Sequence, residues 1–321
     1  MMELTVKRPA PDFMRRQEVR ATLRELLDRG PVLAPCVFDC MSATVVEQIG
    51  FQAMCLSGGN LAMSLLGVPD IGLVSFGELL DAVRRIANYS KLPMIVDIDT
   101  GFGNELNVIR TCERIANAGA MAVHLEDQVN PKRCGHMSGK EVISREEYVS
   151  KLKAAKYALE GTDCMLIART DSYSVLGVEE AIWRNKAAYD LGADVSFTEG
   201  TRTMKDIERI AKEVPGLKMF GMNSMGASPK VTFKELTDFG YQLVTAHFAK
   251  VGALKGMFQL GQYLYDEGTD IHNLDGGYDN FKSHEMFGIH EWYQLAATFN
   301  PSIVESELLH ALDENGNELA R

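Results

Sequence analysis

The sequence predicts an α/β protein built as a (β/α)8 barrel. Eight short and continuous apolar runs recur along the chain, and amphipathic segments with helical periodicity separate them. Continuous rather than alternating apolar runs are expected for strands that are buried on both faces of a parallel sheet. An open doubly wound sheet is the alternative, but no G-x-G-x-x-G motif follows the first strand. The repeated βα unit therefore favours the closed barrel.

The predicted elements begin with a polar helical segment at about residues 12–29. Strands are predicted at 32–38, 52–57, 94–99, 121–126, 165–169, 194–199, 218–222 and 241–246. Gly119 and Gly192 end helical patterns shortly before a strand, where a helix C-cap is expected. A long helical pattern at about 251–265, a polar Gly-rich stretch and one or two short helices follow the last strand. We therefore expect an N-terminal helical segment (1–30), a barrel that carries the site (31–267) and a helical C-terminal appendage (268–321).

Composition and charge disfavour several classes of protein. The chain has 321 residues, of which 46% are hydrophobic and 24% charged, as in ordinary globular proteins. Its net charge of −11 disfavours nucleic acid and anionic membranes as partners, because both require a basic surface. We find no apolar run long enough for a membrane span and no signal-peptide pattern. The six scattered Cys residues are consistent with reduced thiols and a cytoplasmic location.

Carboxylates follow several predicted strands at their carboxyl ends, which form the active-site face of such barrels. Asp97 and Asp99 end the third strand, Glu126 ends the fourth and Glu199 ends the sixth. An Asp at such a point can serve as the N-cap of the next helix, but this role explains only one or two of them.

Asp97, Asp99 and Glu126 are predicted to form a cation site. Asp97 and Asp99 are separated by one residue of an extended run, so their side chains should share a face. Three neighbouring carboxylates are electrostatically costly unless a cation lies among them. Oxygen ligands that do not form a complete cage favour Mg²⁺, with Mn²⁺ as the alternative.

A small, oxygen-rich anion is the expected substrate. Arg169, at the end of the fifth strand, can bind a carboxylate through its planar fork of donors. Ser57, Gly58 and Gly59 follow the second strand, where they permit close backbone approach and offer N–H groups to a second carboxylate.

The loop after the fourth strand contains the run Lys132-Arg133-Cys134-Gly135-His136, or KRCGH. The two cations should favour the thiolate of Cys134 and make this thiol more acidic than an isolated one. A solvated basic loop with an incidental Cys is the alternative. The position of the loop allows it to close over the barrel mouth as a lid.

Several motifs resemble the isocitrate lyase / phosphoenolpyruvate mutase superfamily, in particular its methylisocitrate lyase and 2,3-dimethylmalate lyase type. The resemblance covers about residues 18–265, and KRCGH together with DIDTGFG is its most specific part. The motifs are LSGG (56–59), LGVPD (66–70), VDIDTGFG (96–103), HLEDQ (124–128), KRCGH (132–136), IARTD (167–171) and GADVSFTE (192–199).

The resemblance implies a role for each of these residues. Asp97 would bind the metal, while Asp99 and Glu126 would hold metal-bound waters. Cys134 would be the proton donor, with His136 and Glu199 as candidates to set its proton state. The implied lid residues are Lys132, Arg133, Gly135 and His136, and the implied substrate contacts are Ser57, Gly58, Gly59, Arg169 and Glu199. Asp70 would shape the site, and the last barrel helix would be exchanged between subunits of a homotetramer.

Two positions depart from the family pattern. Cys55 stands where many methylisocitrate lyases have an aromatic residue. After the seventh strand, Gly221 and Ser224 occupy positions that are Asn and Glu in many relatives, and Asn223 is a candidate replacement in the substrate contact. The general base is left open, and His247 is expected to pack at the barrel rim rather than to reach the pocket.

The predicted function is Mg²⁺-dependent carbon–carbon cleavage of a small 2-hydroxy di- or tricarboxylate, of the 2-methylisocitrate or 2,3-dimethylmalate type. The products would be a 2-oxo acid resembling pyruvate and a carboxylic acid. Oxaloacetate acetylhydrolase is the first alternative, and a phosphonate mutase or hydrolase is a weaker one. A catalytically inactive structural barrel is the non-enzymatic alternative.

Overall fold

The computed structural model describes residues 21–276 and 280–300, and the chain divides into two compact units. One unit spans Val19–Val251, and the described residues after Val251 belong to the other. The predicted boundaries of the barrel domain, after residue 30 and after residue 267, stay a prediction.

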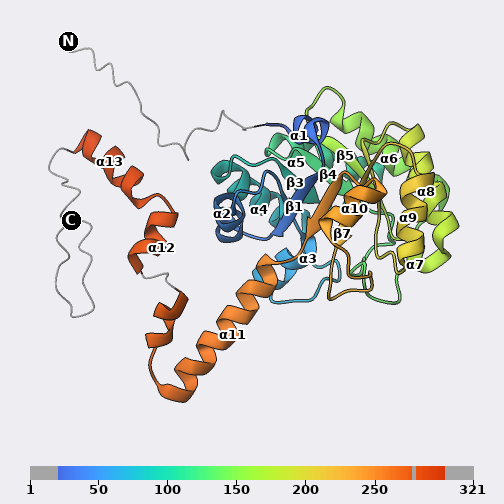
Figure 1. The fold of residues 1–321 in the computed structure, drawn as a ribbon. Coiled ribbons are helices and arrows are strands. Elements are labelled where there is room, and N and C mark those ends of the chain that lie inside the picture. Colours follow the sequence, from blue (N-terminus) through green and yellow to red (C-terminus); the bar gives the residue numbers. More distant parts are fainter. Residues whose placement is uncertain (1–20, 277–279, 301–321) are drawn as a thin grey trace, which may run out of the picture. The chain divides into compact units, whose positions relative to one another are not determined.

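Eight parallel strands form a closed barrel in sequence order, so the predicted (β/α)8 fold is confirmed (Figure 1). The last strand closes onto the first with Val32 opposite Leu243. Each strand lies within a residue or two of its predicted position. The strands are β1 (Val32–Val37), β2 (Met54–Leu56), β3 (Met94–Asp97), β4 (Ala122–Leu125), β5 (Met165–Thr170), β6 (Val195–Thr198), β7 (Leu217–Met222) and β8 (Leu243–Ala246).

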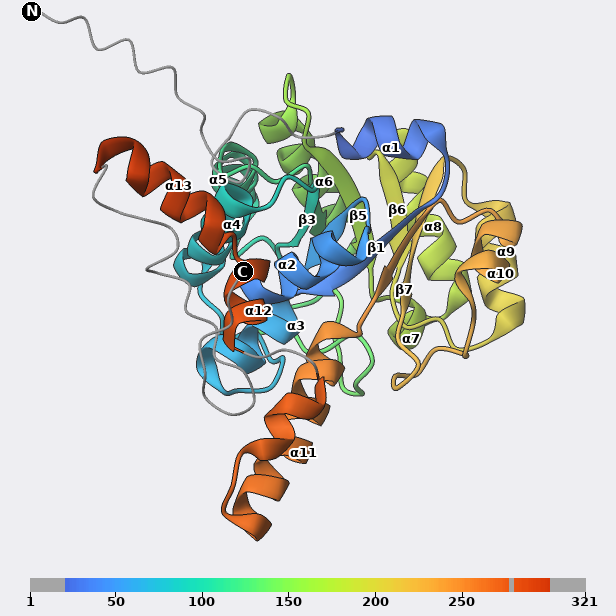
Figure 2. The same cartoon turned by 60° about the vertical axis from the view of Figure 1, so that its left-hand side comes forward.

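Helices surround this barrel, with α2, α4 and α5 on one side and α6, α8 and α9 on the other (Figures 1 and 2). Their first turns are fixed by side-chain caps, such as the capping box between Ser75 and Glu78. The helices of this unit are α1 (Leu23–Arg29), α2 (Cys40–Ile49), α3 (Gly58–Leu61), the π-helical turn η2 (Ala62–Leu66), α4 (Phe76–Tyr89), α5 (Glu105–Asn117), α6 (Arg145–Leu159), α7 (Tyr173–Leu176), α8 (Val178–Asp190), α9 (Met204–Glu213) and α10 (Phe233–Phe239).

The strands divide the core into an inner and an outer cluster. On β3, Ile95 belongs to the inner cluster, while Met94 and Val96 belong to the cluster that includes the surrounding helices. This alternation is expected when one strand face lines the barrel and the other meets helices. Leu23 and Leu27 of α1 join the inner cluster, so this helix closes the end of the barrel away from α3 and α7 (Figure 2).

The chain continues from the barrel into α11 (Ala249–Glu267), which includes the long helix predicted after the last strand. It is followed by η3 (Ile271–Gly276), α12 (Asn280–Met286) and α13 (Ile289–Phe299), which confirms the predicted short helices. α11 buries none of its side chains, and Phe258 and Tyr265 are largely exposed, at 76% and 86%. Among the described helices, none has the length and apolar character required to cross a membrane.

Candidate active site at the carboxyl ends of the strands

The polar residues predicted from the strand ends meet at the mouth of the barrel. A cavity of about 50 Å³ lies there, lined by side chains from most of the strands and from the lid loop. Asp97, Arg169, Glu199, Ser57 and His136 are among its lining residues. The structure therefore places the predicted metal, substrate and lid residues around one space.

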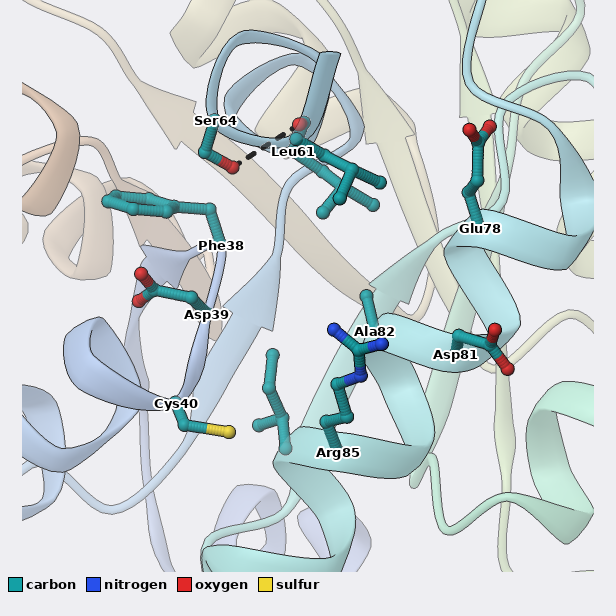
Figure 3. Close-up of a pocket in the computed structure, with 11 residues that line it drawn as sticks. Phe38, Asp39, Cys40, Leu61, Ser64, Glu78, Asp81, Ala82 and Arg85 are labelled. Carbon is teal, nitrogen blue, oxygen red and sulfur yellow. Dashed lines mark hydrogen bonds between the residues drawn. The ribbon is translucent and has the colours of Figure 1, made fainter.

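A larger pocket of about 340 Å³ lies at the rim of the barrel (Figure 3). Its walls come from the junction of β1 with α2, from η2 and from α4, and Phe38, Leu61 and Arg85 contribute to them. None of the residues predicted for the site lines this pocket. We therefore assign the site to the smaller cavity.

Asp97 and Asp99 flank the same space, but not for the predicted reason. β3 ends at Asp97, and Asp99 has φ 48°, so the backbone has left the extended conformation there. The expected strand alternation is wrong at Asp99. A Cβ atom on Gly58 would lie 3.2 Å from Asp99 Oδ1 and 3.3 Å from Asp97 Oδ2, which shows that the turn still brings the two carboxylates together. A glycine at position 58 leaves room for both.

Lys132 of the lid inserts its ammonium group among these carboxylates. Its Nζ atom lies 2.8 Å from Asp99 Oδ1 and also contacts Asp70, and only 2% of its surface is exposed. Burial alone would raise the pKa of Asp97, but His124, Lys132 and Arg169 lower it to about 2. Burial and the neighbouring Asp97 raise the pKa of Asp99 to about 6.

Arg169 forms ion pairs with two carboxylates at the barrel mouth. Its Nη2 atom lies 3.0 Å from Glu126 Oε2, and its Nε donates to Asp171 Oδ2 at 2.9 Å. Burial raises the pKa of Glu126 well above its ordinary value, although Arg169 opposes this rise. The guanidinium is thus held by two carboxylates while it still lines the cavity.

The carboxylate cluster fits a divalent cation. Asp99 Oδ1 and both oxygens of Glu126 are buried without a hydrogen-bond partner in the described part of the chain, although Lys132 and Arg169 lie within ion-pair distance. Buried carboxylates remain costly while their oxygens lack partners, and a divalent cation would supply those partners. No group of three or more His, Cys, Asp or Glu side chains among the described residues is already arranged as a complete metal site. Asp97, Asp99 and Glu126 would hold Mg²⁺ together with waters and substrate oxygens, as this ion prefers.

The lid is closed onto the barrel through backbone contacts as well as side chains. A Cβ atom on Gly135 would lie 2.3 Å from Glu199 Cγ and 2.8 Å from Arg169 Nη2, so only glycine permits this approach. His136 Nε2 lies 3.1 Å from Glu199 Oε1, and His136 Nδ1 accepts a hydrogen bond from Ala227 N. The loop after β7 thus supports the lid.

Cys134 is a protonated thiol rather than the acidified one that its neighbours in sequence suggested. Burial raises its pKa, and the charges of Asp70 and Glu199 raise it further. The expected lowering is wrong because Lys132 is occupied by Asp70 and Asp99, while the side chain of Arg133 is exposed. As the lid lies in this structure, His136 lines the cavity but Cys134 does not.

Of the remaining predicted substrate contacts, Ser57 lines the cavity, whereas Gly58, Gly59 and Asn223 do not. Ser57 caps α3, and the Gly58 N–H points to Asp97 Oδ2 at 3.4 Å, while Gly59 packs against Asp70. Asn223 accepts a hydrogen bond from Met225 N within its own loop and does not line the cavity, whereas Gly221 does.

Several cavity or lid residues were not predicted from the sequence. Lys140 is buried, donates to Asp171 Oδ1 at 3.0 Å and also to the Gly135 carbonyl, so it ties the lid to the barrel. His124, a polar residue within an apolar run, lies 3.4 Å from Asp97 through its Nδ1 atom. His247, expected to pack at the rim, instead lines the cavity beside Cys36. His124 and His247 could have been found from the sequence, because one interrupts an apolar run and the other directly follows the last strand, whereas the contacts of Lys140 depend on residues distant in sequence.

Sequence relatives match this chain over most of their length. The chain matches the phosphoenolpyruvate phosphomutase family over residues 23–256. It is 36% identical to the petal death protein of Dianthus caryophyllus, covering 87% of this chain and 89% of that protein. It is 37% identical to the 2,3-dimethylmalate lyase of Eubacterium barkeri (79% and 89% covered), and 35% identical to a 2-methylisocitrate lyase of Aeropyrum pernix (84% and 87% covered).

Solved structures show the same relationship. A 2,3-dimethylmalate lyase superposes with a TM-score of 0.82 at 33% identity, covering 87% of this chain and 94% of that one. An oxaloacetate acetylhydrolase in complex with 3,3-difluorooxalacetate also gives 0.82, at 32% identity and with 88% and 96% covered. A phosphonopyruvate hydrolase with bound oxalate and Mg²⁺ gives 0.76 at 28% identity, with 87% and 97% covered.

These relatives confirm the predicted class, a carbon–carbon lyase, and one structural neighbour contains Mg²⁺. The chain therefore belongs to the phosphoenolpyruvate phosphomutase family, within the PEP mutase/isocitrate lyase superfamily.

Proposed function

We propose that the protein cleaves a small 2-hydroxy dicarboxylate or tricarboxylate, in the presence of Mg²⁺, into a 2-oxo acid and a carboxylic acid. The observation that carries this proposal is the closure of a lid with a protonated Cys134 over a mouth lined by Asp97, Arg169 and Glu199. The relatives named 2,3-dimethylmalate lyase and 2-methylisocitrate lyase support the substrate class.

The carboxylates of the mouth would hold the cation and the substrate. Bound Mg²⁺ supplies a Lewis acid for the oxygen that becomes the carbonyl of the 2-oxo acid. Asp97 is suited to this site because its low pKa keeps it ionised across the physiological range. Arg169 can offer donors to a substrate carboxylate, since it lines the cavity beside Asp97.

The lid would supply the proton that completes the reaction. Cleavage of the C–C bond leaves an electron pair on the departing carboxylic acid as an enediolate, whose charge Arg169 and lid N–H groups can stabilise. Cys134 would then donate its proton to that carbon, which is a suitable task for a thiol whose pKa is raised. Because Cys134 does not line the cavity in this arrangement, the proposal requires the lid to move by a small step.

Hydrolysis of oxaloacetate is a second candidate. The similarity to an oxaloacetate acetylhydrolase structure supports it. The cavity of about 50 Å³ is smaller than any of these acids, so the mouth has to open for each of them.

The subunit assembly and the cellular location are proposed on the same basis. We infer a homotetramer in which α11 packs on a neighbouring subunit, because this helix exposes Phe258 and Tyr265 and buries no side chain. The free thiols among the described residues support a reducing, cytoplasmic environment.

The test is a product screen with Mg²⁺ and a panel of candidate acids. The panel contains 2,3-dimethylmalate, 2-methylisocitrate, oxaloacetate and phosphonopyruvate, with products identified by NMR. We expect turnover of 2,3-dimethylmalate or 2-methylisocitrate that is lost on chelation and in Asp97→Asn, while Asp163→Asn, an exposed aspartate outside the site, retains it. Turnover of oxaloacetate alone would favour the second candidate, and turnover of phosphonopyruvate alone or of none of the acids would contradict both.

A further inference from the structure

A cluster that the proposed chemistry leaves unused lies on the wall of the cavity. Cys36 of β1, Cys55 of β2 and His247 directly after β8 all line this space. β1 pairs with β2 on one side and with β8 on the other, and Cys36 lies opposite Cys55 in the register. Three groups that are distant in sequence thus meet on one arc of the barrel.

His247 connects Cys36 to a polar side chain on the far side of the ring. His247 Nε2 lies 3.8 Å from Cys36 Sγ, and His247 Nδ1 lies 3.4 Å from the amide nitrogen of the buried Asn60. An amide nitrogen only donates, so Nδ1 accepts this hydrogen bond and the proton of the neutral ring is on Nε2, which faces the sulfur. A donor that faces a sulfur favours its thiolate form.

The electrostatics of Cys36 agree with this geometry. A hydrogen bond from Cys55 and the nearby His247 lower the pKa of Cys36 to about 5, despite its burial. Burial has the opposite effect elsewhere, because it raises the pKa of Cys112 to about 12 and also raises that of Cys164. The pKa of Cys36 therefore differs from those of Cys112 and Cys164 because of its neighbours, since all three thiols are buried.

Other charged groups face the cluster and bear on its protonation. Asp97 of β3 opposes the lowering at Cys36. The charge of Cys36 raises the pKa of His247, with Lys250 opposing and Glu199 adding to this rise. The positive and negative groups around the cluster therefore act on Cys36 and His247 in opposite directions.

The cluster lies on a different part of the site from the lid thiol. Cys36 belongs to the inner core cluster, on the strand side of the cavity, whereas Cys134 is carried by the loop above the mouth. The environments of the two thiols shift their pKa values in opposite directions, down for Cys36 and up for Cys134. A pair of titratable groups whose environments separate their pKa values is the usual basis of acid and base assignment.

We propose that Cys36, oriented by His247 and Asn60, is the proton acceptor of the cleavage reaction, an inference that rests on the proposed function. The Cys36 thiolate takes the proton of the substrate's 2-hydroxyl group and becomes a thiol. The oxygen electron pair forms the carbonyl of the 2-oxo acid as the C–C bond breaks, and the pair from that bond remains on the departing acid. Cys134 protonates this carbon and becomes a thiolate. After the lid opens, Cys36 releases its proton to solvent and Cys134 takes one up, which restores the Cys36 thiolate and the Cys134 thiol without net gain or loss of protons or electrons.

The test compares Cys36→Ser with a matched control, Cys164→Ser, which alters a buried free thiol outside the cavity. We expect Cys36→Ser to lower kcat by about 10²- to 10⁴-fold, with the KM and the Mg²⁺-dependent affinity for oxalate changed by less than about threefold. The wild type should show an ultraviolet thiolate absorbance that persists into the acid range. This absorbance should disappear in Cys36→Ser, remain in Cys164→Ser and move to higher pH in His247→Gln.

The outcomes separate the two proposals. If Cys36→Ser retains wild-type kcat, or if the acid-range thiolate signal is absent from the wild type, Cys36 is not the acceptor and the lyase function stands. If the wild type turns over none of the acids, both proposals fail. Should Cys36→Ser not fold, as judged by thermal unfolding, His247→Gln decides the matter through the same kcat and absorbance measurements.

Discussion

Lys132 Nζ lies 2.8 Å from Asp99 Oδ1, so the lid itself carries a cation into the carboxylate cluster of the barrel mouth. The same ammonium contacts Asp70, and the main-chain carbonyl of Asp70 accepts a hydrogen bond from Cys134 N. The position of the loop that carries Cys134 is thereby coupled to the charge of the carboxylate cluster, the proposed metal site. A cation that binds the cluster has to share Asp99 with Lys132.

Replacing Lys132 by Met should destabilise the metal-free protein. Asp99 and Asp70 would lose their buried partner, which costs about 2–4 kcal/mol in the free energy of unfolding. Mg²⁺ should restore much of this loss, because it neutralises the same carboxylates. Urea unfolding with and without Mg²⁺ measures both effects, with the exposed Lys153→Met as the control. Equal stability of Lys132→Met and wild type without Mg²⁺ would show that this contact contributes nothing.

Replacing Gly135 by Ala should prevent closure of the lid. The added methyl group would lie 2.3 Å from Glu199 Cγ, far inside van der Waals contact, and the loop would have to rise. We expect kcat to fall by about 10²-fold, since misplacement of a catalytic group by about 1 Å has this effect. Thermal unfolding should be nearly unchanged, because the loop lies outside the core. Ser138→Ala, on an exposed part of the same loop, should be fully active, and loss of activity there would argue against a specific role for Gly135.

The raised pKa of Cys134 predicts the alkaline side of the pH profile. Only the thiol form can donate a proton, so kcat should fall as pH rises through the pKa of Cys134. Burial and the carboxylates of Asp70 and Glu199 place this pKa above the ordinary thiol value of about 8.5. The pH dependence of kcat at saturating substrate and Mg²⁺ should therefore be flat through neutral pH. A decline that begins below the ordinary thiol pKa would contradict the assignment.

Arg184 should be a major contributor to the stability of the barrel mouth. Its side chain is buried and donates to Asp127 Oδ2 at 3.0 Å, while Asp127 Oδ1 accepts a hydrogen bond from Asp171 N. Arg184→Met would leave Asp127 as an uncompensated buried charge and should cost about 3–5 kcal/mol. The partly exposed Arg209, paired with Glu213, gives a control whose loss should cost less than about 1 kcal/mol. Chemical denaturation of both variants compares the two, and similar losses would show that the buried pair has no special role.

The fold could be predicted from the sequence because the barrel depends on local patterns. Each strand is a continuous apolar run, and β5, for example, is found with all six residues buried. The same reasoning failed at Asp99, where the left-handed turn is not visible in the alternation of side chains.

The site was predicted less completely, because its energetics depend on contacts between distant residues. Lys132 and Asp70 are 62 residues apart, and their pairing takes up the charge that was expected to lower the pKa of Cys134. Cys36 and His247 are 211 residues apart, and no local pattern relates them. Strand ends reveal which residues gather at the mouth, whereas their protonation states follow from the packed structure.

The origin of the proton on the departing acid tests the central claim most directly. The reaction is run in D₂O with the substrate identified by the product screen, and deuterium in the departing carboxylic acid is measured by NMR. We predict that the wild type places one deuterium on the carbon released by cleavage, and that Cys134→Ser still binds oxalate with Mg²⁺ but forms almost no product. Wild-type rates of cleavage and deuteration in Cys134→Ser would show that the lid thiol is not the proton donor.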